Sequence, residues 1–344
     1  MRGRVYADDG VTPAVGAVVT VLNHPELGQT ATRSDGWYDL AVNGGAPVTI
    51  DVNAAGYLRV QRTVPTKWNG YAFADDVVLT PPQTSADTYV VGASTGQLVR
   101  GALTPTGIDG DGARRTVVYF PPNTQILNYP VSNGTPLAVQ ISEYTRDRGQ
   151  ERMPGELPPT SAYTYAVEVT FPAAAAAGID DVHFGDPVIL YQDNFTNHPV
   201  GATVPVGYYD RERGAWLAEE SGRIIELITA PSGGEATIDI DGDGVAESPA
   251  TLTSFGIAAD ERVKLAVEYG AGKVLWRSPV MHFSSWDCNW NAGPPTGAAP
   301  PPQPDPNDED IGCPTKRPGS IIGCESRTLG EAIPIVGTGT CQRG

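Results

Sequence analysis

The sequence predicts a mostly β fold with more than one domain. Short runs of β-branched and aromatic residues recur along most of the chain, and turn-forming residues separate them. The 40 glycines and 31 prolines exceed the usual combined share of roughly 12% and favour many turns. Since a domain typically has roughly 100–200 residues, a chain of 344 residues, 40% of them hydrophobic, is expected to form two or three packed domains.

Residues 1–83 are predicted to form a small all-β domain. The expected strands lie at residues 5–6, 17–22, 37–42, 48–52 and 60–64. The turn before the third of them has a physical basis, because Asp35 can accept hydrogen bonds from nearby backbone and Gly36 tolerates a positive φ. The strand that follows is expected to alternate between inward and outward side chains, so a hairpin is predicted at this turn.

Residues 84–290 are predicted to form a second β-rich domain. Its expected strands lie at residues 116–120, 163–171, 187–191, 203–209 and 224–228. Helix is predicted at residues 258–269, which Gly270 ends, and for one or two turns at residues 172–177.

The remaining residues differ in character from both domains. Residues 291–319 form a linker or strap rich in proline and acidic residues, a composition that favours extended polyproline II. Strand-like runs follow at residues 320–322 and 332–336, with no later strand to pair against. We therefore expect residues 320–344 to be the start of a truncated, larger architecture.

The charge balance excludes some classes of partner. Lys and Arg number 23 against 40 Asp and Glu, which gives a net charge of -17 and disfavours binding to nucleic acid. A protein of this charge suits secreted or calcium-rich surroundings. No apolar stretch is long enough for a membrane span, and no signal peptide is visible after Met1, so we expect unconventional export or a start further upstream.

One acidic segment predicts a metal site. Asp239, Asp241 and Asp243 alternate along the chain, Gly244 permits a sharp turn, and Glu247 follows at the ninth position. Carboxylate oxygens in this spacing are hard donors that suit Ca²⁺, so a structural calcium ion is predicted. The twelfth position of the loop is Ala250, not the glutamate of an EF-hand, which makes the shorter thrombospondin-like form the better match. The alternative is a solvated acidic turn, in which the carboxylates would repel one another.

No catalytic residue is predicted. Ser94 lies in a G-x-S-x-G pattern that is typical of hydrolases, but residues 97–112 contain too many glycines for the helix that such a nucleophile needs. A hydrolase is therefore the least favoured function. The histidines lack zinc-site spacing and are expected to be structural: His24, His183, His198 and His282.

Four cysteines lie in the last 57 residues: Cys288, Cys313, Cys324 and Cys341. Their even number, in the part of the chain with least hydrophobic core, favours disulfides formed in an oxidising compartment. Three pairings are possible, and Cys313 with Cys324 is the first choice because it closes a short loop. The alternative is that the thiols are reduced. An aromatic cluster is expected to pack in the interior, with sugar stacking as its alternative: Trp276, Phe283, Trp286 and Trp290.

The first domain carries four segments typical of one family, at residues 3–5, 13–21, 32–40 and 55–57. Together they resemble the carboxypeptidase regulatory-like domain, a transthyretin-like β-sandwich. The resemblance covers about a quarter of the chain. It implies a scaffold module without catalytic residues of its own.

A second resemblance covers nearly the whole chain. Its segments occur in family order at residues 153–165, 207–216, 221–224, 276–283, 286–290, 293–295 and 329–338. They resemble bacterial teneurin-like RHS proteins, also called YD-repeat proteins. The resemblance implies that residues 84–290 are a fibronectin-plug-like domain, and that YD repeats would form a β-shell around a C-terminal effector of the polymorphic-toxin type. After residue 338 the sequence departs from the family pattern, which leaves the effector out of reach.

These observations predict a non-enzymatic structural module of a secreted or cell-surface protein. By the second resemblance, it would plug or support a YD-repeat shell of the same or a neighbouring chain, with a cell-surface protein or glycan as a further partner class. The alternative is a stand-alone extracellular binding or adhesion module for a carbohydrate or protein ligand.

Overall fold

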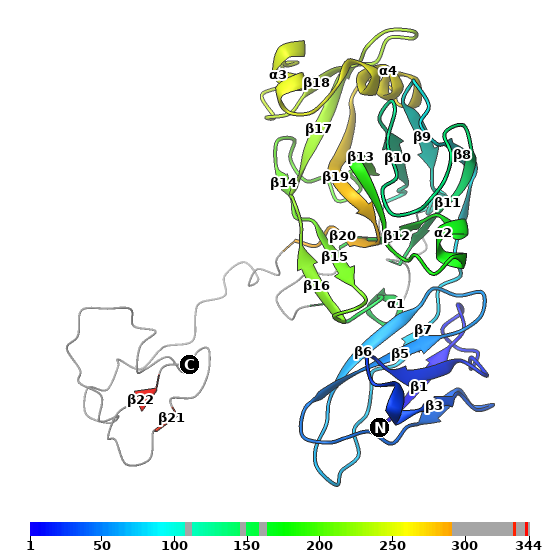
Figure 1. The fold of residues 1–344 in the computed structure, drawn as a ribbon. Helices are drawn as coiled ribbons and strands as arrows, with labels where there is room; N and C mark the ends of the chain where they lie inside the picture. Colours follow the sequence, from blue (N-terminus) through cyan, green and yellow to red (C-terminus); the bar gives the residue numbers. More distant parts are fainter. Residues whose placement is uncertain (107–111, 145–148, 158–163, 291–332, 335–340, 343–344) are drawn as a thin grey trace, which may run out of the picture. The chain divides into compact units, whose positions relative to one another are not determined.

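The computed structural model describes residues 1–106, 112–144, 149–157, 164–290, 333–334 and 341–342, and it confirms a mostly β fold (Figure 1). The chain forms two compact units, Met1–Ala292 and Gly293–Gly344. In the second unit, β21 (Ile333–Pro334) pairs with β22 (Cys341–Gln342). The expectation that the run at residues 332–336 has no later strand to pair against is therefore wrong, because residues 341–342 supply that strand. The predicted linker at residues 291–319 and the strand at 320–322 lie outside the described residues.

Residues 1–83, the first predicted domain, lie within the unit Met1–Ala292 and form a sandwich of two sheets. One sheet has the order β4-β1-β7 and the other β3-β2-β5-β6. The strands are β1 (Arg2–Tyr6), β2 (Val18–Val21), β3 (Gln29–Ala31), β4 (Trp37–Asp39), β5 (Pro47–Asn53), β6 (Val60–Pro65) and β7 (Val77–Val78), with a 3-10 helix, η1, at Pro25–Leu27. Val5, Val19, Tyr38 and Ile50 are fully buried between the sheets, so the alternating apolar positions do face a common core.

The turn predicted at Asp35-Gly36 forms, but the predicted hairpin is wrong. Gly36 has a φ of 79°, and the amide of Trp37 donates to Asp35 Oδ1 at 3.1 Å. The turn joins two different sheets, because β4 pairs with β1 while β3 pairs with β2. Gly3 lies opposite Tyr38 in that pairing, and a Cβ at Gly3 would lie 2.2 Å from the Tyr38 hydroxyl. The glycine therefore provides the space that the tyrosine ring occupies, which favours β1 as the partner.

Residues 84–290, the second predicted domain, lie in the same unit, and their described residues form two larger sheets. The first has the order β14-β17-β19-β13-β10-β9, with β18 also paired to β17, and the second has the order β16-β15-β20-β12-β11-β8. In chain order the strands are β8 (Thr84–Val90), β9 (Gln97–Arg100), β10 (Thr116–Phe120), β11 (Pro136–Glu143), β12 (Ala166–Thr170), β13 (Val182–Asp193), β14 (Thr203–Val204), β15 (Gly207–Asp210), β16 (Ala215–Ala218), β17 (Gly222–Thr229), β18 (Thr237–Asp239), β19 (Lys273–Phe283) and β20 (Ser285–Asp287).

The described residues of this region also form four α-helices: α1 (Gly149–Arg152), α2 (Pro172–Ala176), α3 (Pro249–Ser254) and α4 (Ala259–Glu268). The two predicted helices are thus confirmed as α2 and α4. Helix α3 was not predicted, although the sequence holds its signal: Ser248 accepts from the Thr251 amide as N-cap, and Pro249 takes the first helical position. Within the described part of the chain, no helix has the length and apolar character that a membrane span requires.

The single strand predicted at residues 203–209 is wrong. It is divided into β14 and β15, which belong to different sheets. Pro205 lies between them and has no amide to donate, so one continuous ladder cannot form across it.

The aromatic cluster packs in the interior of the second domain. Trp276, Phe283 and Trp286 are at most 1% exposed and belong to its main core. Cys288 is buried in the same core, and burial raises the pKa of its thiol. It is a free cysteine among the described residues. The predicted disulfide between Cys313 and Cys324 lies outside the described residues.

Polar and apolar contacts join the two domains. Leu58 of the first domain packs with Tyr144, Met153 and Ala166 of the second. The guanidinium of Arg62, which is 1% exposed, donates to the carbonyl oxygens of Glu151 at 2.7 Å and Met153 at 3.0 Å. At the junction, the Arg62 guanidinium thus supplies to these carbonyl oxygens the hydrogen bonds that water would otherwise supply.

The outer edge of β6 is also covered at this junction. The Gln61 amide donates to the carbonyl oxygen of Pro154 at 2.7 Å, and its side chain bonds to Tyr209 and to the backbone of Arg211. Arg211 in turn donates to the carbonyl oxygen of Arg59. The edge of the first domain is therefore closed by the second domain instead of being left open to water.

Candidate metal centre

The predicted metal-binding residues lie in the loop that follows β18. Asp239 is the last residue of that strand and is 1% exposed. Its neighbours Ile238 and Ile240 are buried in the core that α3 and α4 help to form, so the backbone at Asp239 is anchored on both sides. The loop closes at Glu247, whose amide donates to the Ile238 carbonyl oxygen at 2.9 Å.

The Asp239 carboxylate organises the start of this loop. Its Oδ1 accepts from the amides of Asp241 at 3.0 Å and Gly242 at 2.7 Å, and its Oδ2 accepts from Gly244 at 2.8 Å. Gly242 and Gly244 have φ values of 87° and 79°, a left-handed conformation in which a side chain would be strained. The chain therefore curls around one carboxylate, as the glycine spacing predicts.

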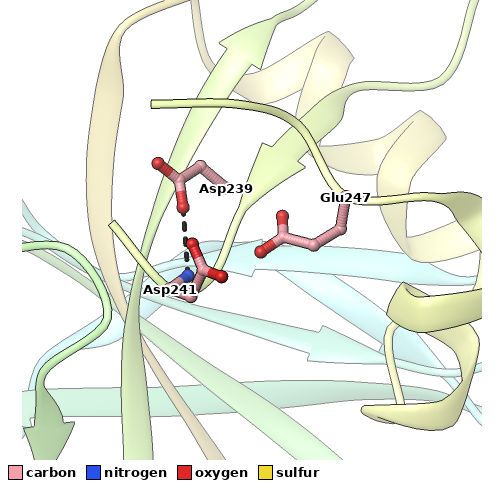
Figure 2. A group of neighbouring side chains, drawn as sticks. All are labelled: Asp239, Asp241 and Glu247. Atoms are coloured by element: carbon pink, nitrogen blue, oxygen red, sulfur yellow. Dashed lines mark hydrogen bonds between the residues drawn. The ribbon is translucent and has the colours of Figure 1, made fainter. Parts of the chain in front are cut away.

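Three of the four predicted ligands converge. Carboxylate oxygens of Asp239, Asp241 and Glu247 lie within 4.8 Å of one another (Figure 2). Glu247 Oε1 accepts from the Ile240 amide at 2.9 Å, while its Oε2 is enclosed and has no hydrogen-bond partner. Clustered acceptors with an unsatisfied buried oxygen are costly unless a cation or a donor neutralises them.

Asp243 is not part of this group. Its Oδ1 accepts from the Val245 amide at 2.7 Å, and its own amide donates to Asp241 Oδ1 at 3.2 Å. Asp243 is exposed and continues the run of turns past the converging oxygens.

A neighbouring turn fixes the position of the loop. A Cβ at Gly201 would lie 2.4 Å from the Asp241 carbonyl oxygen, and one at Gly242 would lie 2.5 Å from the Val200 carbonyl oxygen. The two backbones are thus in direct contact, and only glycine fits at either position. The contact holds the Asp241 backbone from outside the loop.

The other sequence candidates do not assemble into a site. Ser94 lies in the turn between β8 and β9, so a strand follows it where a nucleophile elbow would have a helix. His183 and His282 are cross-strand partners with ring centroids 5.3 Å apart, a proximity that their sequence spacing does not reveal. Among the described residues, the acidic loop is the one group with three clustered candidate ligands.

The residues at the domain junction were missed from the sequence. Arg62 lies between Val60 and Val64, at an inward position of an alternating strand. A charged residue at such a position is itself a signal of a partner beyond the strand, because an unpaired buried charge is unstable.

Comparison with known proteins agrees with the fold of the first domain. Residues 1–79 match the family model of the teneurin TTR-like domain. Over 79 aligned residues the chain is 39% identical to Teneurin-3 of Danio rerio, 40% to Teneurin-1 of Gallus gallus and 40% to Teneurin-m of Drosophila melanogaster. These matches cover 23% of this chain and 3% of each relative. Residues 1–79 therefore carry a teneurin TTR-like domain.

Proposed function

We propose that this chain is a non-enzymatic structural module of a secreted or cell-surface protein. Its TTR-like domain and second β domain would act as one brace that plugs or supports a β-shell of YD repeats. The observation that carries the proposal is the junction, where Arg62 and Gln61 are buried against the second domain. Buried side chains that are hydrogen-bonded across the junction favour one relative orientation of the two domains, which suits a structural module.

The proposal predicts capture of a separately expressed YD-repeat fragment. The whole chain would be immobilised, and binding of the fragment would be measured by surface plasmon resonance. We expect saturable binding that is lost when the chain is thermally unfolded, since a plug must present a folded surface. Absence of binding to the folded chain, with a fragment shown to be folded, would contradict the plug.

One observation favours the alternative of a binding or adhesion module. Three aromatic side chains between β6 and β7 are exposed: Trp68 by 77%, Tyr71 by 87% and Phe73 by 64%. Exposed aromatic groups of this kind mark interaction sites for proteins or sugars. Binding to a glycan array that is lost on replacing all three by alanine, together with no capture of the YD-repeat fragment, would favour this function.

We further propose that the acidic loop binds Ca²⁺ as a structural ion. Asp239, Asp241 and Glu247 would supply the first ligands, and Asp243 would join them by turning away from the Val245 amide. Calcium accepts six to eight oxygen ligands in flexible geometry, so carbonyl oxygens and water can complete the shell. The ion would stiffen the loop beside α3 and neutralise the clustered carboxylates.

Calcium is expected to stabilise the folded chain. At a free concentration of about 100 times Kd, it should raise the free energy of unfolding by about 2.7 kcal/mol. Urea unfolding in calcium and in chelator would measure the difference. Asp241→Asn should remove most of it, and Asp243→Asn should reduce it less, because only Asp241 lies in the converging group. Equal unfolding curves in calcium and chelator would refute the site.

A further inference from the structure

The strand β16 (Ala215–Ala218) is an edge of its sheet and, among the strands that the structure describes, pairs only with β15 (Figure 1). In an antiparallel pair, hydrogen-bonded and non-hydrogen-bonded residue pairs alternate. The Glu219 amide donates to the Val206 carbonyl oxygen at 3.0 Å, so Leu217 and Tyr208 form the next hydrogen-bonded pair. The peptide groups of Trp216 and Ala218 consequently face away from β15.

These outward peptide groups have no partner in the described part of the chain. No hydrogen bond joins the backbone of Trp216 or Ala218 to another described residue. Each residue presents one N–H and one C=O along the free edge, spaced as a neighbouring strand requires. The edge is thus a template on which a further strand can form.

The edge strands β6, β14, β8 and β9 are protected. The edge of β6 bonds to Pro154. Strand β14 has two residues and is followed by Pro205. Strands β8 and β9 close against each other, since Val90 and Arg100 donate backbone amides to side chains of the opposite strand. By contrast, β16 has the sequence AWLA, with no charge, proline or glycine to oppose pairing.

The side chains of β16 favour an apolar partner. Trp216 contacts the Tyr209 ring at 5.2 Å and donates from its indole to the Gly155 carbonyl oxygen at 3.2 Å. Leu217 lies opposite Tyr208 on the other face of the sheet. Both Trp216 and Leu217 are half-buried, so an added strand with apolar residues would continue these two rows and cover them.

Charge at the ends of β16 decides between partners. Glu219 and Glu220 follow the strand, and the exposed Glu212 precedes it, whereas Arg213 is paired with Asp210. Antiparallel pairing of two copies would bring these acidic ends together in chains that each carry a net charge of -17. A second copy is therefore disfavoured, and a basic strand is favoured.

We propose that the free edge of β16 binds an extended segment of a partner polypeptide by β-strand addition. The segment has apolar residues at alternate positions and Lys or Arg at its ends. Main-chain hydrogen bonds to Trp216 and Ala218 supply the docking, and the acidic residues beside the strand select for basic ends. Strand addition at β16 requires neither a YD-repeat shell nor calcium, so its test is independent of the tests of those two proposals.

The test uses the whole chain and a short capped peptide of alternating valine and threonine with a lysine at each end. Affinity is measured by fluorescence anisotropy and amide protection by hydrogen exchange. Saturating peptide is expected to slow exchange at Trp216 and Ala218 by about tenfold or more, and to leave Leu217 unchanged, because its amide is already bonded to β15. Unchanged exchange at Trp216 and Ala218 would overturn the proposal.

Two substitutions of Ala218 distinguish backbone pairing at the edge from non-specific binding of the peptide. Ala218→Pro removes the outward N–H, and an edge strand tolerates proline, so affinity should fall about tenfold. Ala218→Thr keeps the N–H and should bind within about threefold of the original chain. Equal affinity of the two variants would overturn the proposal. Where Ala218→Pro lowers the melting temperature, Glu220→Lys replaces it and should weaken binding most at low salt.

Self-association is followed in the same samples. Protection of Trp216 and Ala218 that rises with protein concentration, without peptide, would show that a second copy occupies the edge and would overturn the assignment to a basic partner. Sedimentation of a single monomeric species, together with peptide-dependent protection, supports it.

Discussion

Replacing Arg62 by leucine is expected to lower the free energy of unfolding by about 3 kcal/mol. The guanidinium donates to carbonyl oxygens on both sides of the domain junction, at 2.7 Å to Gln61, 2.7 Å to Glu151 and 3.0 Å to Met153. Leucine fills part of the volume but donates no hydrogen bond to any of these carbonyl oxygens. The loss of these hydrogen bonds, and not the loss of a charge, dominates the expected change.

Urea unfolding monitored by tryptophan fluorescence would measure this change. Arg62→Lys should lower the free energy of unfolding by less than Arg62→Leu, because the lysine ammonium can still donate to one of the carbonyl oxygens. It should still lower it, because an ammonium cannot reach several carbonyl oxygens at once as the planar guanidinium does. Arg213→Leu is the exposed control, since its side chain is 69% exposed, and should change stability by less than about 0.5 kcal/mol. If Arg62→Leu and Arg213→Leu unfold alike, the junction does not brace the two domains.

Local patterns in the sequence predicted most of the first domain. Strands β5 and β6 follow from alternating Val and Ile positions, and the turn at Gly36 follows from its need for a positive φ. The partner of β4 could not be predicted in this way, because it depends on the space that Gly3 leaves for the Tyr38 ring across the sheet. Pairing is decided by residues far apart in the chain, and periodicity does not report it.

The sequence predicted which acidic residues lie in the candidate metal centre, but not how each of their side chains is arranged. The alternating carboxylates and the glycines specify a curled loop, and Asp239, Asp241 and Glu247 do converge. The turn that holds this loop comes from Gly201, which no motif connects to Asp241. Asp243 Oδ1 instead accepts a hydrogen bond from the nearby Val245 amide. This local hydrogen bond competes with convergence on the other carboxylates, and the spacing of the aspartates does not show which of the two forms.

Stability is expected to depend on pH through Asp287 on β20. Burial raises the pKa of this carboxyl to about 6, against hydrogen bonds from Asn289 and the Gly207 backbone that lower it. Because the folded pKa lies above the usual 3.8, the folded state binds more protons than the unfolded state between about pH 4 and pH 6. The stabilisation of the folded state by proton binding to Asp287 is therefore fully present below about pH 4 and is lost as the pH rises through about 6.

Between about pH 4 and pH 7 the free energy of unfolding should fall by about 3 kcal/mol through Asp287, since each unit of pKa shift corresponds to about 1.4 kcal/mol. Asp287→Asn cannot ionise, so its free energy of unfolding should fall less than that of the original chain between pH 4 and pH 7. Urea unfolding at several pH values would compare the two slopes. Glu220→Gln removes an exposed acid of the same charge and serves as the control for a general effect of net charge.

A difference between the Asp287→Asn and Glu220→Gln slopes would locate the effect in the core. Asp287 pairs in register with Gly207 of β15 and with Ala166 of β12, so its ionisation places a charge between the strands that meet the domain junction. Neutralising that charge at low pH should therefore stabilise β15, the strand on which the β16 edge depends. Identical slopes for all three chains would show that Asp287 is solvated in the folded protein and that its burial carries no energetic cost.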